Sequence, residues 1–432
     1  MREFTPLGAA LGYVLLTDKL QDCEGARLNM EQYTQAERLQ GVRYDVRGPN
    51  MVEAMKMEAR GDRILKLHIG NTGPFGFRAP ESMVKAMVSH LIDAEGYSDS
   101  AGIHSARTAV MNYYQAHGID VDVDQVWLGN GVSELISIVL QAMINTDDEI
   151  LIPAPDYPLW TGQTTLSGAK AVHYLCDENN GWNPDLADIR SKVTPRTKAI
   201  VLINPNNPTG AVYSREIVQG IVDIARENNL IVLSDEIYEK IIYEGEHVFS
   251  ATLCGDDVLC ITFSGLSKAY RACGWRAGWM VITGPLRKAS SLIEGITLLC
   301  NMRMCANVPA QYTIQTALGG KQSIERLVKP GGRFYEQLNL SADMLNDIPG
   351  VSVVPASGAL YLFPRLDPAV YPIDDDEKWA LGLLHDQKVL VSHGRGFNWP
   401  NPDHFRLVAL PDKEMLRDGI NRIANYLAKL RA

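Results

Sequence analysis

Cysteine is scarce in this sequence: its seven residues among 432 are an odd number and include no C-x-x-C pair. They are scattered along the chain, at Cys23, Cys176, Cys254, Cys260, Cys273, Cys300 and Cys305. The lack of paired spacings argues against a zinc site or a thiol redox motif. Scattered cysteines of this kind are typical of a reducing compartment, and we therefore expect the protein to be cytoplasmic.

Long apolar runs and an excess of positive charge are also missing. No uninterrupted apolar segment approaches the roughly 20 residues that span a bilayer, and the apolar stretch 6–16 has no small-residue cleavage site before Asp18. Lys and Arg total 41 against 51 Asp and Glu, and the resulting net charge of -10 repels a nucleic-acid backbone. We expect neither a membrane nor a nucleic acid as a partner.

Motifs for nucleotide and metal chemistry are absent as well. No predicted strand leads into G-x-G-x-x-G or G-x-x-x-x-G-K-[ST], and no H-E-x-x-H motif occurs, so we expect no metal. What the sequence does have is the composition of an ordinary soluble enzyme, with 46% hydrophobic and 21% charged residues. Its 432 residues exceed what one hydrophobic core usually fills, which favours two domains.

Short apolar runs alternate with amphipathic segments after Phe75. We interpret the runs as buried strands at 126–128, 150–152, 199–203, 230–233 and 259–263. Helical periodicity covers 80–95, 102–117 and 214–228. Near-continuous apolar strands separated by helices predict an α/β protein, with a mostly parallel sheet covered on both faces.

From about residue 316 the pattern changes. Two long helices at 332–346 and 412–430 are combined there with short strands at 351–354, 359–363 and 405–408. We expect this part to form a smaller domain. The predicted division is an N-terminal extension (1–43), a segment that joins the small domain (44–75), a large domain (76–315) and the C-terminal small domain (316–432).

Polar residues follow the predicted strands, and in open α/β sheets ligands bind at the carboxyl ends of the strands. Gly131, Val132 and Ser133 open a helix whose free N–H groups suit a phosphate, although Ser133 as a plain helix cap is the alternative. After the strand at 199–203, two prolines and a glycine fix a rigid loop that aims the Asn207 amide. The same loop needs no function as a turn.

The last two strands of the series end in ionisable residues. Asp235 either caps the next helix or is a buried anion that keeps the nitrogen of a bound heterocycle protonated. Further on, Ser264, Ser267, Lys268 and Arg276 bring together hydroxyls, an amine and a guanidinium. A lysine in such a place can form a Schiff base, and an arginine offers a planar fork to phosphate. Surface placement is the alternative for both.

Five polar residues occur in the order and approximate spacing of class I aminotransferases. They are Asn207, Asp235, Tyr238, Lys268 and Arg276. From about Tyr44 onward the chain thus resembles the fold-type I pyridoxal-phosphate family, most specifically in the segments NNPTG and SGLSK. The resemblance implies pyridoxal 5'-phosphate as cofactor. It also implies a large domain that binds this cofactor, with a mostly parallel seven-stranded sheet between helices, and a smaller α+β domain.

The resemblance assigns a role to each of the cofactor-binding residues. Lys268 would carry the cofactor as a Schiff base and later move a proton between the substrate carbon and the cofactor. Asp235 would pair with the protonated pyridine nitrogen and keep the ring an electron sink. Asn207 and Tyr238 would hydrogen-bond the phenolate oxygen, and Tyr157 would stack on the ring.

The phosphate would lie between Arg276, Ser264 and the helix opening at Gly131, Val132 and Ser133. Many relatives have the phosphate serine three residues before the lysine, whereas Ser264 lies four before it. Which of Ser264 and Ser267 contributes is therefore open.

The resemblance also implies residues that bind the substrate and the partner subunit. Arg406 falls where the family places the arginine that grips the substrate carboxylate. Gly70 matches the glycine that lets the substrate approach the backbone. Tyr97 resembles the tyrosine that reaches the partner's phosphate, which implies a homodimer with a shared active site.

Three segments look like the alanine aminotransferase subgroup: 44–49, 71–77 and 393–399. That subgroup exchanges the amino group of L-alanine with 2-oxoglutarate by a ping-pong mechanism, which yields pyruvate and L-glutamate. Tyr44 and Arg47 would close over the site, with Arg47 as a partner for the second carboxylate.

Other functions fit the same residues. An aspartate, aromatic or branched-chain aminotransferase is the nearest alternative, followed by a C–S β-lyase of the same fold. An aminotransferase-like sensor of a transcription regulator is a non-enzymatic alternative. It needs a DNA-binding module, and the first forty residues hold no basic helix-turn-helix.

Overall fold

The structure is a computed structural model that describes residues 33–431, and the chain separates into two compact units, Met1–Gln40 and Gly41–Ala432. The described part of the first unit contains one 3-10 turn, η1 (Glu37–Leu39), which buries no residue. The predicted N-terminal extension is 1–43, and residues 1–32 of it lie outside the described residues. The other predicted boundaries fall within the second unit and stay predictions.

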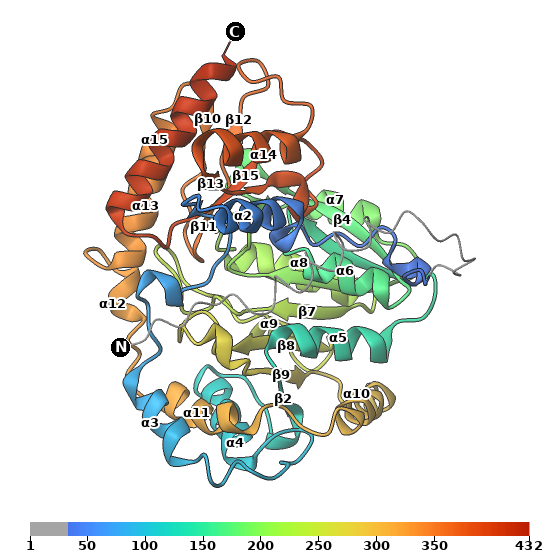
Figure 1. The fold of residues 1–432 in the computed structure, drawn as a ribbon. Helices are drawn as coiled ribbons and strands as arrows, with labels where there is room; N and C mark the ends of the chain where they lie inside the picture. Colours follow the sequence, from blue (N-terminus) through green and yellow to red (C-terminus); the bar gives the residue numbers. More distant parts are fainter. Residues whose placement is uncertain (1–32, 432) are drawn as a thin grey trace, which may run out of the picture. The chain divides into compact units, whose positions relative to one another are not determined.

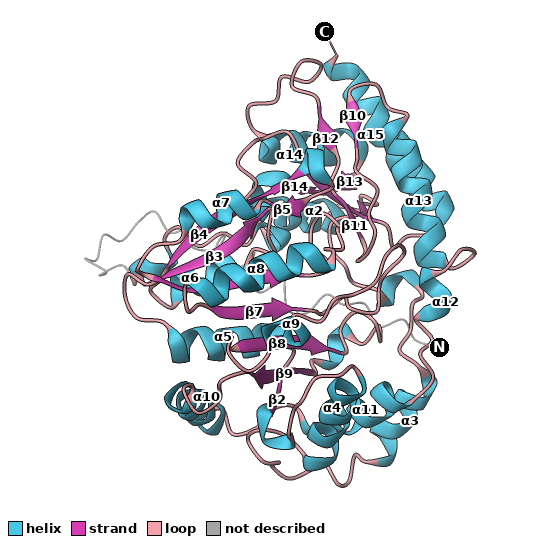
Figure 2. Ribbon diagram, turned by 180° about the vertical axis from the view of Figure 1, so that it is seen from behind, coloured by secondary structure: helices cyan, strands magenta, loops and turns pink. Residues whose placement is uncertain are grey.

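A twisted sheet forms the centre of the second unit (Figure 1; Figure 2). Among residues 33–431 it has eight strands in the order β2-β9-β8-β7-β6-β3-β4-β5. Their bounds are β2 (Val126–Gly129), β3 (Glu149–Ala154), β4 (Lys170–Asp177), β5 (Asn183–Pro184), β6 (Thr197–Ile203), β7 (Ile231–Asp235), β8 (Cys260–Gly265) and β9 (Gly278–Thr283). The pairs from β8 through β7, β6 and β3 to β4 are parallel, whereas β9 and β5 run antiparallel to their neighbours.

The predicted α/β class and mostly parallel sheet are confirmed. The five apolar runs became β2, β3, β6, β7 and β8, whereas β4 and β9 were not recognised in the sequence. The eighth strand, beyond the seven that the resemblance implied, is the two-residue edge β5.

Both faces of the sheet are buried because each central strand sends alternate side chains to opposite cores. In β6, Ile200 and Leu202 enter one core, whereas Val201 and Ile203 enter the other. The first core is completed by α4 (His104–Ala116), α8 (Arg215–Glu227) and α11 (Val308–Gly319). The second is completed by α5 (Val132–Met143), α6 (Leu159–Leu166) and α10 (Ser290–Met302).

The C-terminal part builds a separate core. Its helices α13 (Arg333–Asn346), α14 (Asp376–Gln387) and α15 (Lys413–Leu430) pack with β10 (Val351–Ser352), β11 (Tyr361–Leu362), β12 (Arg365–Leu366) and β15 (Phe405–Val408). The N-terminal strand β1 (Leu65–Lys66) joins this part through parallel pairing with β13 (Val389–Leu390). Strand β14 (Ser392–His393) pairs with β15.

The remaining short elements connect these layers. They are η2 (Asp45–Arg47), α2 (Pro49–Ala59), η3 (Gly73–Phe75), α3 (Glu81–Ser89), η4 (Val123–Gln125), η5 (Glu178–Asn180), α7 (Leu186–Lys192), α9 (Ala251–Cys254), η6 (Cys273–Trp275), α12 (Glu325–Val328) and η7 (Gly394–Phe397). Helix α3 ends six residues before the predicted 80–95 segment does. Leu91 and Ile92, which extended the apolar pattern, are exposed and do not face a core. No helix within residues 33–431 is long and apolar enough to cross a bilayer.

Candidate active site

A cavity of about 870 Å³ opens at the carboxyl ends of the parallel strands. Most of the predicted site residues line it: Tyr44, Arg47, Gly70, Val132, Ser133, Tyr157, Asn207, Asp235, Tyr238, Ser267, Lys268, Arg276 and Arg406. These residues come from both ends of the second unit, so the fold itself assembles the cavity.

Lys268 follows the end of β8 and extends its amine into the cavity. Its Nζ donates a hydrogen bond of 3.2 Å to the carbonyl oxygen of Gly70. A Cβ atom at Gly70 would lie 2.5 Å from the Tyr361 hydroxyl and 3.3 Å from this Nζ. Position 70 therefore requires glycine, because any side chain would displace the groups that surround the amine.

Asp235 is the last residue of β7 and its side chain is buried at the base of the cavity. Trp160 Nε1 donates to its Oδ2 over 3.2 Å, and the Ile237 amide donates to its Oδ1 over 3.3 Å. Burial raises the pKa of Asp235 to about 6, despite the Trp160 hydrogen bond that lowers it. A positive charge placed beside this carboxylate would return the pKa to its ordinary acidic range.

Arg406 on β15 is a buried cation that faces the cavity. Its Nη1 donates to Asn207 Oδ1 over 2.9 Å, and its Nη2 donates to the His68 carbonyl oxygen. The guanidinium carbon lies 4.5 Å from the Tyr361 ring centroid and 4.4 Å from that of Phe397. Among the described residues its Nε has no hydrogen-bond partner. A buried guanidinium with unused donor capacity suits a planar anion such as a carboxylate.

Tyr238 and Tyr361 form a buried hydroxyl pair whose oxygens lie 2.7 Å apart. Burial raises the pKa of Tyr238 well above its usual value. Burial also opposes ionisation of Tyr361, but the positive charges of Lys268 and Arg406 hold its pKa below the usual value. The two hydroxyls therefore differ in acidity, and Tyr361 is the more acidic of the pair.

The start of α5 and Arg276 form a part of the cavity that suits an anion. Helix α5 begins at Val132 with no side-chain cap, so its first N–H groups are free. Arg276 donates through Nη1 to Ser267 Oγ over 3.3 Å and through Nη2 to the Asn130 carbonyl oxygen over 3.2 Å. Gly131 has φ +81°, and a Cβ there would clash with the Arg276 guanidinium. Glycine thus allows the arginine and the helix start to converge.

The N-terminal segment covers one side of the cavity. The hydroxyls of Tyr44 and Tyr157 lie 2.7 Å apart, and Arg47 lines the same wall. A hydrogen bond of 3.2 Å between Asp45 Oδ2 and His393 Nε2 joins η2 to β14. This contact fixes the position of the residues on either side of Asp45.

Three predicted site residues do not line the cavity. Ser264 lies within β8, buried and paired with Trp279 of β9. Gly131 lies just behind the wall, against Arg276. Tyr97 is 81% exposed and is not among the residues that line the cavity, and its predicted role requires a second copy of the chain.

Tyr361 and Trp160 are site residues that the sequence did not single out. Tyr361 falls in a predicted strand, 359–363, but its direction toward Lys268 depends on the tertiary fold. Trp160 lies three residues after Tyr157. A tryptophan near a strand end is usually part of the hydrophobic core, so the sequence alone does not indicate a role in the site. The hydrogen bond to Asp235 is visible only once α6 packs on the sheet.

The fold and the lysine, aspartate and arginine that meet in this cavity define an α/β enzyme of the aminotransferase type. Residues 63–423 match the model of the family described as aminotransferase class I and II, and the chain belongs to that family. The predicted family and enzyme class are thereby confirmed. Pyridoxal phosphate is implied by membership of the family.

Individual relatives place the chain more narrowly. It is 57% identical over 401 residues to a protein named alanine aminotransferase from Mycobacterium tuberculosis, covering 92% of this chain and 94% of that protein. It is 52% identical over 400 residues to the glutamate-pyruvate aminotransferase AlaA of Escherichia coli, with coverage of 92% and 99%. The predicted resemblance to alanine aminotransferases is confirmed.

Solved structures agree with this similarity. The structure of an aminotransferase from Escherichia coli matches with a TM-score of 0.92 and 52% identity, over 93% of this chain and 100% of that chain. An alanine aminotransferase from Pyrococcus furiosus matches with a TM-score of 0.87 and 36% identity, over 92% and 100%.

Proposed function

We propose that the protein is a pyridoxal-phosphate-dependent alanine transaminase, which converts L-alanine and 2-oxoglutarate to pyruvate and L-glutamate by a ping-pong mechanism. The observation that carries the proposal is the convergence of Lys268 Nζ, the buried Asp235 carboxylate and the buried Arg406 guanidinium on one cavity. The relatives named alanine aminotransferase and glutamate-pyruvate aminotransferase support the choice of substrates.

The residues present fit the cofactor. Asp235 is a buried acceptor in need of a cationic neighbour, which a protonated pyridine nitrogen supplies. Asn207 and Tyr238 both line the cavity and are assigned to the phenolate oxygen, and Tyr157, which also lines it, is assigned to the ring face. Arg276 is assigned to the phosphate. When bound, the cofactor supplies an electron sink for the bond that breaks at the substrate α-carbon.

The rest of the phosphate cradle follows from the cavity wall. Val132 and Ser133 bring the free N–H groups of α5, and Gly131 lets the helix start approach Arg276. We assign the hydroxyl contact to Ser267, which lines the cavity, ahead of Ser264, which lies within β8.

Lys268 is assigned the proton transfer. Its Nζ takes a proton from the substrate α-carbon in one direction of the reaction and returns a proton in the other. The Gly70 carbonyl orients this amine from the opposite wall.

Arg406 is assigned to the α-carboxylate that every substrate of the reaction carries. Its planar fork can meet both carboxylate oxygens, and its burial strengthens the attraction. Arg47, with Tyr44 beside it, is assigned to the second carboxylate of glutamate and 2-oxoglutarate. Its exposed position at the mouth lets the site accept the small side chain of alanine as well.

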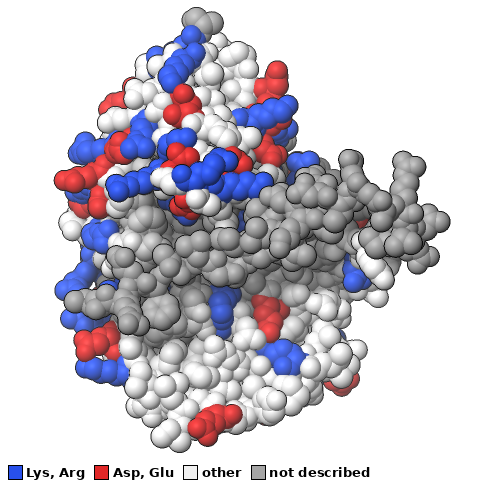
Figure 3. All heavy atoms as spheres, viewed as in Figure 1, with Lys and Arg blue, Asp and Glu red and all other residues white. Residues whose placement is uncertain are grey.

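We also propose a homodimer in which Tyr97 reaches the partner's phosphate site, located in the cytoplasm. Support comes from exposed apolar side chains in and after α3, namely Val84, Val88, Leu91, Ile92 and Tyr97. The surface over α3, α4 and α11, at the bottom of the view, is largely uncharged (Figure 3). Apolar patches of this kind are typical of subunit contacts. The division into domains at 44–75, 76–315 and 316–432 is part of the same proposal.

A substrate panel on the purified protein with its cofactor tests the reaction. Alanine with 2-oxoglutarate as acceptor should give the highest kcat/KM, ahead of aspartate and phenylalanine. A higher value for another amino donor would overturn the choice of alanine. Release of pyruvate and ammonia from cystathionine without any oxo-acid acceptor would instead indicate a β-lyase.

A further inference from the structure

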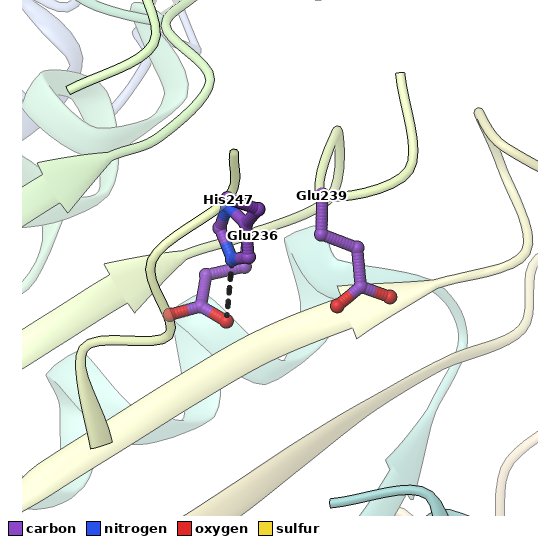
Figure 4. Close-up of side chains that lie close together, drawn as sticks. All are labelled: Glu236, Glu239 and His247. Atoms are coloured by element: carbon purple, nitrogen blue, oxygen red, sulfur yellow. Dashed lines mark ion pairs between the residues drawn. The ribbon is translucent and has the colours of Figure 1, made fainter. Parts of the chain in front are cut away.

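Behind the proposed active site, three ionisable side chains converge in the interior. Glu236 directly follows β7, Glu239 lies in the next turn, and His247 comes from the loop before α9 (Figure 4). One ligand-capable atom from each lies within 4.8 Å of the other two. Glu236 is 0% exposed and Glu239 is 6% exposed, and the side chain of His247 is 6% exposed.

Several atoms of this cluster lack the hydrogen bonds that buried polar groups normally make. Glu236 Oε1 accepts from Ser234 Oγ over 2.8 Å and from the Ser250 amide over 3.1 Å. Within residues 33–431, however, Glu239 Oε2 and His247 Nδ1 have no hydrogen-bond partner, and Glu236 Oε2 and His247 Nε2 have none besides the contact of 3.3 Å that they make with each other (Figure 4). Each such buried group costs about 1–3 kcal/mol when left unsatisfied, so the cluster calls for a ligand.

Among the described residues, no lysine or arginine makes an ion pair with either carboxylate. Lys240 Nζ lies over the Tyr113 ring, 4.4 Å from its centroid, and makes no ion pair with either glutamate in the described part of the chain. Burial raises the pKa of Glu239 to about 6, although Lys240 and His247 oppose the rise.

We propose that Glu236, Glu239 and His247 bind a divalent transition cation, best matched by Zn²⁺, through two carboxylate oxygens and one imidazole nitrogen. Glu236 Oε2 and His247 Nε2 lie 3.3 Å apart. Ligand atoms of a tetrahedral zinc site with bonds of about 2.0–2.2 Å are about 3.3–3.6 Å from one another. The donor set of nitrogen and oxygen is one that zinc accepts, and two ionised carboxylates balance its charge.

A second cavity lies beside the histidine of the cluster. His247 lines a second cavity of about 630 Å³, together with Glu244, Glu246 and Phe249. Water from this cavity can complete the tetrahedron, as in zinc sites with three protein ligands. The cation would join the loop at His247 to the turn that follows Asp235. It would therefore stabilise the support of the active site without entering it.

Zinc binding to the purified holoenzyme, stripped with a chelator and dialysed, tests the proposal. Titration with Zn²⁺ alone should give one tightly bound ion per chain, measured by calorimetry and by elemental analysis. Glu239→Gln and His247→Gln should each weaken the affinity roughly 100-fold, because each removes a ligand. The matched control is Glu246→Gln, an exposed acidic residue of the same cavity, which should bind zinc as the wild type does.

X-ray absorption of the zinc-loaded wild type gives a test that needs no variant. The first shell should contain only nitrogen and oxygen, at about 2.0–2.2 Å. A sulfur ligand at about 2.3 Å would instead place the ion at thiols such as Cys273 or Cys305 and would overturn the site. The site is equally excluded by a wild type that retains no stoichiometric zinc, or by folded variants that bind it unchanged.

Discussion

Arg406 Nη1 donates to Asn207 Oδ1 across 2.9 Å, which links a C-terminal strand to the rigid loop after β6. The contact joins the residue assigned to the substrate carboxylate with one assigned to the cofactor ring. A carboxylate that binds the Arg406 guanidinium therefore also changes the surroundings of the Asn207 amide. We therefore expect substrate binding and cofactor chemistry to be coupled through this hydrogen bond.

Arg406→Lys keeps the positive charge but removes the planar fork. We expect kcat/KM for both alanine and 2-oxoglutarate to fall about 100-fold, since losing a buried, hydrogen-bonded charge contact costs about 2–5 kcal/mol. Cofactor content, read from absorbance, should stay at the wild-type level. Arg422→Lys on the exposed face of α15 is the control and should leave both values unchanged. A loss below threefold in Arg406→Lys would remove the residue from substrate binding.

Arg47→Gln tests whether Arg47 binds only the substrates that carry a second carboxylate. The variant should raise KM for 2-oxoglutarate and glutamate about tenfold, because only these carry a second carboxylate for the arginine to meet. KM for alanine should change little. Arg43→Gln, an exposed neighbour that does not line the cavity, is the matched control. Equal effects on alanine and 2-oxoglutarate would show that Arg47 does not select the longer substrate.

Gly70→Ala tests the tight packing around the lysine amine. The added Cβ would lie 2.5 Å from the Tyr361 hydroxyl, a distance that forces the hydroxyl or the backbone to move. We expect kcat to fall at least about tenfold, because small displacements of reacting groups have large effects on rate. Gly319→Ala, where a Cβ meets nothing within 4 Å, should retain wild-type activity. Full activity of Gly70→Ala would mean that the close approach has no catalytic value.

The raised pKa of Asp235 predicts that the stability of the cofactor-free protein depends on pH. Its pKa rises from 3.8 to about 6 on folding, so the folded state binds more protons than the unfolded state between these values. The free energy of unfolding should therefore fall as pH rises from about 4 to 6, by up to about 3 kcal/mol from this one group. In Asp235→Asn, which cannot ionise, this part of the slope should vanish.

Urea denaturation of both proteins at several pH values measures the difference between the slopes. Pyridoxal phosphate should flatten the wild-type slope, since a positive ring nitrogen stabilises the carboxylate. Parallel wild-type and variant curves would contradict the buried position of Asp235.

The sequence predicted the parts of the site that local chemistry determines. Strands β6, β7 and β8 are apolar runs buried on both faces, and the residues that follow them necessarily meet at one edge of the sheet. Tyr361 and Trp160 escaped notice because their direction depends on packing between elements far apart in the chain. The Glu236, Glu239 and His247 cluster has no metal-binding spacing that a sequence motif would reveal.

The sequence alone also could not decide which of two serines contacts the phosphate. Ser264 and Ser267 are equivalent candidates by composition, but β8 extends to Gly265 and so keeps Ser264 inside the sheet. Only the end of the strand, which pairing with β9 determines, brings Ser267 to the cavity.

The central claim is that Lys268 holds pyridoxal phosphate covalently. Borohydride reduction of the protein with its cofactor, followed by peptide mapping with mass spectrometry, tests it directly. The cofactor should be found on the Nζ atom of Lys268 at close to one per chain. Attachment to another lysine, or no attachment in protein that is fully active, would contradict the proposed function.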